Sequence, residues 1–198
     1  MKYKFFAILF LAVAGIQGAF AQNMQVGLEL GLEVPVGDFS IGYAPGYCFG
    51  ASGKYFLNEK MAVGGNLLYN SFHGYVFKDV YSYETWRNSA AATAFTGLFQ
   101  YNFTDGKAKL YGGGDLGFYF WRSRYYYDYW INPAGHHSYE YRTWHETELG
   151  IAPFGGIAYD ISDKLVFDGN IKLNLMLSQI GLNYLGFNVG LFYKFGGE

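Results

Sequence analysis

The sequence predicts an all-β protein, an eight-stranded antiparallel up-and-down transmembrane β-barrel with extended extracellular hairpins. Three observations support this prediction. Charged residues make up only 15% of the 198 residues and aromatic residues 22%, whereas soluble domains hold about 25% charged residues. Apolar side chains alternate with small or polar ones over roughly ten residues at a time, as in strands with one apolar face. The connections between these segments alternate between short and long, as they do in membrane barrels.

Residues 1–21 have the features of a signal peptide. Lys2 and Lys4 precede an apolar stretch over 5–16, and Ala19 and Ala21 frame a cleavage site before Gln22. The stretch is too short for a membrane helix, which needs about 20 apolar residues. We therefore expect an exported chain with its barrel domain at 22–198. Loss of the two lysines would change the net charge from −2 to −4.

Eight segments carry the strand pattern. In the first, 24–36, Leu28, Leu30 and Leu32 alternate with residues such as Gly27 and Glu29. The seventh segment, about 165–177, and the eighth, 184–195, repeat this alternation clearly. The others are predicted at 46–57, 61–72, 89–103, 108–121 and 146–160. An even number of strands places both ends of the barrel on one side of the membrane, and the first strand must pair with the last because lipid tolerates no open sheet edge.

The lengths of the connections indicate which end of the barrel faces the periplasm. Residues 58–60, 104–107 and 161–163 form tight turns, and longer links lie at 37–45, 73–88, 122–145 and 178–183. Outer-membrane barrels have short periplasmic turns and longer external loops. If the chain starts inside, every short turn falls on the periplasmic side.

Aromatic residues in the apolar register gather at the two strand ends, which favours a membrane barrel over a soluble one. One group lies near the predicted periplasmic ends: Tyr55, Tyr101, Phe103, Tyr159, Phe167, Tyr193 and Phe195. The other lies near the external ends: Tyr47, Tyr69, Phe118 and Phe120. Two aromatic girdles around an apolar band are typical of membrane barrels.

The opposite strand face carries charges, which we interpret as a salt-bridge network filling the lumen. This lumen charge network comprises Glu29, Glu33, Lys54, Asp115, Glu148, Asp168, Lys172 and Lys194, and Lys109 has the same register. Buried charges must be paired, and eight strands leave room for little more than side chains. A proton relay or a catalytic dyad is the alternative.

On these residues the mature chain resembles the small outer-membrane β-barrel proteins of the OmpA/OmpX type. The resemblance covers the signal, the eight alternating segments and the last strand, where residues 188–195 end in the aromatic Phe195. Three further residues, Gly196, Gly197 and Glu198, depart from the family's aromatic terminus. The resemblance implies a bacterial outer-membrane location, contact with outer-membrane lipid and recognition by the barrel-insertion machinery.

The link at 122–145 predicts a hairpin that extends strands five and six, because Pro133 and Gly135 mark a turn between aromatic-rich flanks. The link at 73–88 has similar flanks. Exposed aromatic and arginine side chains are enriched at interfaces. The candidate extracellular binding surface is Trp121, Arg122, Arg124, Tyr126, Trp130, Tyr139, Tyr141, Arg142 and Trp144. Packing of the two hairpins against each other is the alternative.

Other chemistry is weakly supported. His136, His137 and His145 could bind a metal, but neighbouring residues of a strand point to opposite faces. Ser138 with His145 suggests a hydrolase, although nothing fixes a triad. The run 112–117 matches G-x-G-x-x-G without a following helix, and Pro153 predicts a bulge or bend.

We therefore expect no cofactor, no metal, no catalytic residue and no nucleic-acid partner. The expected function is non-enzymatic: presentation of aromatic-rich loops for adhesion, envelope structure or binding of an unknown extracellular ligand or host surface. The alternatives are an enzyme that modifies lipid A or phospholipid, and a narrow solute channel. Cys48, the single cysteine, and the three histidines have no assigned role.

Overall fold

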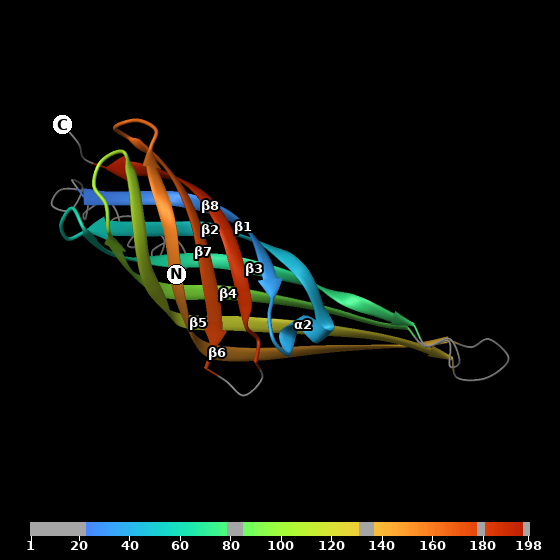
Figure 1. Ribbon diagram of the computed structural model, residues 1–198. Coiled ribbons are helices and arrows are strands. Elements are labelled where there is room, and N and C mark those ends of the chain that lie inside the picture. Colours follow the sequence, from blue (N-terminus) through green and yellow to red (C-terminus); the bar gives the residue numbers. More distant parts are fainter. Residues whose placement is uncertain (1–22, 79–84, 131–136, 178–180, 196–198) are drawn as a thin grey trace, which may run out of the picture.

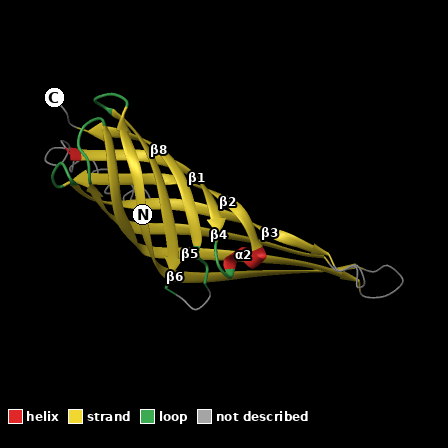
Figure 2. Cartoon of the chain, viewed as in Figure 1, coloured by secondary structure: helices red, strands yellow, loops and turns green. Residues whose placement is uncertain are grey.

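The computed structural model describes residues 23–78, 85–130, 137–177 and 181–195, and the predicted signal peptide lies outside these ranges. Within them, eight strands form one closed antiparallel barrel in chain order (Figures 1 and 2). The strands are β1 (Met24–Pro35), β2 (Tyr43–Phe56), β3 (Met61–Lys78), β4 (Thr85–Asn102), β5 (Ala108–Trp130), β6 (His137–Asp160), β7 (Leu165–Met176) and β8 (Tyr184–Phe195). The barrel closes between β1 and β8, where Met24 lies opposite Phe195. The predicted fold class is confirmed.

The two ends of the barrel differ. The turns after β2, β4 and β6 are short, and with the start of β1 and the end of β8 they form what we call the turn end. At the hairpin end, β3–β4 and β5–β6 continue past the other strands as a long projection (Figure 1). The predicted extension over 122–145 is confirmed in its described part: Arg124 pairs with Thr143, and Trp130 with His137.

The predicted strand faces are confirmed. In β1, Leu28, Leu30 and Leu32 are exposed while Glu29 and Glu33 are buried. Most members of the two predicted aromatic groups are exposed on the outside of the barrel, namely Tyr47, Tyr101, Phe103, Phe118, Phe120, Tyr159, Phe167, Tyr193 and Phe195. The barrel therefore has an apolar exterior and buries charged side chains in its interior, the reverse of a soluble protein.

Two local expectations need correction. Pairing between β6 and β7 skips Ala152 and Pro153 but resumes at Phe154 in the same register. Since proline has no N–H to donate, Pro153 interrupts the ladder without making the predicted bulge. The residues expected to form a loop at 37–45 instead contain the four-residue helix α2 (Phe39–Gly42) and the start of β2. Across the described ranges, no helix has the length and apolarity needed to span a membrane.

Candidate functional site

Two ion pairs cross the centre of the lumen. Lys54 Nζ lies 2.9 Å from Asp168 Oδ2, and Lys172 Nζ lies 2.6 Å from Asp115 Oδ2. All four side chains are almost completely buried. The Tyr111 hydroxyl donates a hydrogen bond of 2.5 Å to Asp168 Oδ1. The ion pairs join β2 to β7 and β5 to β7, which are not neighbours in the sheet, so they link strands that the backbone ladder does not connect directly.

The other residues of the predicted lumen network lie elsewhere. Glu29 and Glu33 are buried, but one carboxylate oxygen of each has no hydrogen-bond partner among the described residues. Glu148 is half-buried opposite Tyr119. Lys194 Nζ lies 2.7 Å from Asp160 Oδ1, and that pair belongs to the turn end. Asp160 is the last residue of β6 and was absent from the predicted network. It has the same strand register as Glu148, which the prediction did include.

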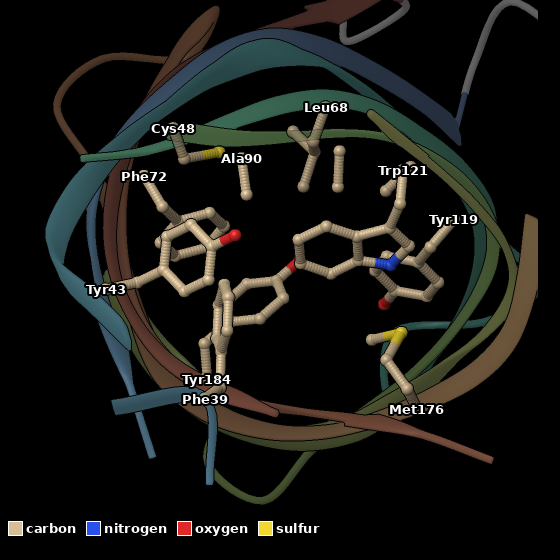
Figure 3. Packing of buried hydrophobic residues seen from close by; sticks show 12 residues of the cluster. Phe39, Tyr43, Cys48, Leu68, Phe72, Ala90, Tyr119, Trp121, Met176 and Tyr184 are labelled. Atoms are coloured by element: carbon tan, nitrogen blue, oxygen red, sulfur yellow. The ribbon is translucent and has the colours of Figure 1, made fainter. Parts of the chain in front are cut away.

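Aromatic side chains close the lumen on the hairpin side of these ion pairs. Phe39 of α2 points into the barrel, with its ring centre 4.9 Å from that of Phe72 and 5.5 Å from that of Trp121 (Figure 3). The rings of Phe72 and Tyr184 are 5.1 Å apart. We call Phe39, Tyr43, Phe72, Trp121 and Tyr184 the aromatic plug. The cavity lined by Glu29, Lys54 and Lys172 below it measures only about 10 Å³, about the smallest volume that holds one water.

Above the aromatic plug lies a cavity of about 880 Å³, here called the hairpin pocket. Phe39 and Tyr43 of the aromatic plug line its base, and most of its other aromatic lining is Trp86 of β4, Trp121, Tyr125 and Tyr127 of β5, and Trp144 of β6. Its charged lining is Asp38, Glu140, Arg142 and Glu146. Arg142 Nε lies 2.6 Å from Glu140 Oε1. This pair neutralises one acid of the pocket, so that Asp38 and Glu146 are left in excess among the described residues.

The hairpin divides the predicted binding surface between its two faces. Trp121, Arg142 and Trp144 line the hairpin pocket. By strand alternation, Arg122, Arg124, Tyr139 and Tyr141 belong to the opposite, convex face. Tyr126 contacts Tyr139 and Tyr141, with ring centres 5.9 and 5.0 Å apart, and also lines the pocket.

Trp121 departs from the predicted exposed surface. Trp121 was expected to be exposed, but only 2% of it is, because it packs into the aromatic plug and forms the pocket floor. The side chain of Trp130 lies outside the described residues. Trp86, Tyr125, Tyr127, Glu140 and Glu146 were not in the predicted set. Period-two alternation continued through the hairpin would have identified those on β5 and β6.

The candidates for other chemistry are not assembled. Ser138 and His145 lie on opposite faces of β6, seven residues and about 24 Å apart along the strand. His136 and the side chain of His137 lie outside the described residues. In the described part of the chain, no group of three or more His, Cys, Asp or Glu side chains could hold a metal ion. The run 112–117 lies within β5 and precedes no helix.

No protein-family model matches the sequence, and comparison with curated proteins gives no match. Solved structures match in fold. Neisserial surface protein A is 17% identical, with 87% of this chain and 97% of that chain covered at a TM-score of 0.50. The attachment invasion locus protein Ail of Yersinia pestis, in complex with the heparin analogue sucrose octasulfate, is 14% identical over 87% and 98% at 0.52. OprG from Pseudomonas aeruginosa is 15% identical over 91% and 96%, also at 0.52.

These matches extend over most of every chain compared. The fold is that of the small outer-membrane β-barrels. The predicted resemblance to the OmpA/OmpX type is thereby confirmed at the level of architecture. Identities of 14–17% establish a shared fold but not a shared ligand or partner. Ligand and partner must therefore be argued from this chain's own residues.

Proposed function

We propose that the chain is a non-enzymatic protein of the bacterial outer membrane that binds an extracellular ligand in the hairpin pocket. The apolar exterior supports the membrane location, because the same surface in water would expose leucines and aromatic rings on every strand. Short turns at one end and extended hairpins at the other support an orientation with the hairpin pocket outside the cell.

The observation that carries the binding function is the convergence of aromatic side chains around one cavity. A volume of about 880 Å³ is within the range of small-molecule sites, about 300–1,000 Å³. Trp86 and Trp144 remain half exposed although they face the cavity. Self-packing of the hairpins would have buried such rings, whereas a ligand that covers them would gain their hydrophobic area.

The charges of the pocket indicate the class of ligand. Asp38 and Glu146 are acids without an ion-pair partner in the described part of the chain, and Arg142 is held by Glu140. Tryptophan and tyrosine faces attract cations. The ligand we propose is therefore cationic or neutral with a flat apolar surface. Ail was solved with sucrose octasulfate, a polyanion, and this pocket offers such a molecule little charge complementarity.

Calorimetry on the detergent-solubilised protein tests this, with benzyltrimethylammonium as the cationic probe and sucrose octasulfate as the anionic one. We expect the cation to bind and the W86A/W144A double variant to weaken binding at least about tenfold, since buried aromatic anchors dominate such sites. The matched control is Y101A/F103A, which removes two exposed rings from the turn end, far from the pocket. Preference for the sulfated probe, or equal losses in both double variants, would overturn the proposal.

The competing functions have their own measurements. If the protein is not an enzyme, the mass spectrum of outer-membrane lipids will be the same with and without the gene. A lipid A or phospholipid product that depends on the gene would contradict that expectation. The filled lumen of the described residues also argues against a channel. We expect no stable conductance in planar bilayers.

A further inference from the structure

The convex face of the hairpin base carries a group of basic side chains that the hairpin pocket does not use. Arg87 of β4, Arg122 and Arg124 of β5 and His145 of β6 are all exposed. We call these four residues the arginine patch. The strand register places them beyond Gly150, where the pairing of β6 with β7 stops, on the part of β4–β6 that forms the projection.

The strand register brings these side chains together. Arg122 lies directly opposite His145, and Arg124 follows Arg122 on the same face, about 7 Å along the strand. Arg87 pairs with Tyr126, which makes it a diagonal neighbour of Arg124. Diagonal neighbours are about 7–8 Å apart. One phosphate-sized anion could therefore contact two guanidinium groups.

No acidic side chain in the described part of the chain neutralises the arginine patch. None of the three arginines forms an ion pair with a described residue. The described residues of the same face, over 85–91 of β4, 120–126 of β5 and 139–147 of β6, include no Asp or Glu. Two acids of the hairpin whose side chains are described, Glu140 and Glu146, face the pocket instead.

The height of the arginine patch matches the edge of the apolar band. On β5 the exposed apolar positions run from Leu110 to Phe120, a length of about 34 Å along the strand. A tilt of about 40° reduces this to about 26 Å, close to the apolar band of about 25 Å in outer-membrane barrels. Arg122 comes two residues later, about 5 Å higher, within the headgroup layer of about 5–7 Å on each side of a bilayer.

We propose that the arginine patch binds the phosphate group of an anionic lipid in the outer leaflet. This inference rests on the proposed outer-membrane location but is independent of the hairpin pocket. Guanidinium groups bind phosphate through paired hydrogen bonds, and the apolar surface at Phe118 and Phe120 directly below can hold the acyl chains. A lipid bound there would anchor the base of the projection at a fixed height.

The test uses the full chain in phosphatidylcholine nanodiscs that contain diphosphorylated lipid A or the same lipid after removal of its phosphates. Lipid A that stays bound after mild detergent extraction is counted by native mass spectrometry. We expect R122Q/R124Q to retain at least about tenfold less phosphorylated lipid than wild type, since each basic residue near a membrane surface contributes to binding anionic lipid. R122K/R124K keeps the charge but loses the paired hydrogen bonds, so it should retain more than R122Q/R124Q and less than wild type.

The matched control is K60Q/K107Q, which removes the same charge from exposed turn-end positions and should retain lipid A like wild type. Equal retention by R122Q/R124Q and the control, or equal retention of the dephosphorylated lipid, would overturn the proposal. Displacement by millimolar inorganic phosphate would also overturn it, because the site would then take a soluble anion. Co-flotation with phosphatidylcholine vesicles tests membrane insertion alone. A protein that floats with the vesicles but does not retain phosphorylated lipid A would contradict only the arginine-patch proposal.

Discussion

Lys172 and Asp115 form an ion pair of 2.6 Å across the barrel interior, between strands that are not neighbours in the sheet. Asn66 also donates a hydrogen bond of 2.9 Å to the same carboxylate oxygen. Each charge is buried and depends on the other. The pair therefore links β5 directly to β7 across β6, a constraint that the backbone ladder alone does not provide.

Replacement of Lys172 by methionine should destabilise the barrel by about 3–5 kcal/mol, because it leaves a buried carboxylate without its partner. The K172M/D115N double variant should recover a large part of that loss, since no buried charge remains at the site. Both free energies can be measured by reversible unfolding into lipid vesicles. If the double variant is as unstable as the sum of the two single variants, the side chains do not interact.

This pair also shows how far the sequence could predict the structure. The eight strands and their two faces follow from period-two alternation and from the alternating lengths of the connections. Alternation places Lys172 and Asp115 in the lumen but does not predict that they pair. Which lumen residues meet depends on the offset between neighbouring strands, which the alternation does not give. Phe39 was not predicted to fill the lumen, since the sequence indicates only a loop there and its inward position depends on the surrounding rings.

An arginine on the outer surface should be most costly at the middle of the apolar band. Ile171 is exposed midway along β7, and Leu177 is exposed just past its hairpin end. Ile171→Arg should cost about 2–4 kcal/mol at the bilayer midplane, and Leu177→Arg about 0–1 kcal/mol near the interface. The free energies of unfolding into vesicles provide the comparison. Equal costs at the two heights would contradict the position of the band.

The aromatic plug should depend strongly on Phe39. Its ring contacts Tyr43, Phe72 and Trp121, and truncating a buried phenylalanine to alanine costs about 3–5 kcal/mol. Ile41 belongs to the same short helix but is 73% exposed, so Ile41→Ala should change stability by no more than about 0.5 kcal/mol. Thermal unfolding in detergent measures both variants. A small effect of Phe39→Ala would mean that α2 does not close the lumen.

The β5–β6 part of the projection should be removable without loss of the barrel, because its backbone pairs only with β4 and within itself, beyond the closed ring. Arg124 and Thr143 are paired, so Asn-Gly in place of residues 125–142 would join them through a two-residue hairpin turn of the favoured type. The shortened chain should still insert into vesicles and keep the heat-modifiable mobility of a folded barrel on gels. It should lose binding of benzyltrimethylammonium, since Tyr125, Arg142 and other parts of the hairpin pocket are gone. It should keep phosphorylated lipid A, because Arg122 and Arg124 remain.

Failure of the shortened chain to fold would show that the hairpin stabilises the barrel. Retained binding of the cation would place the ligand site elsewhere.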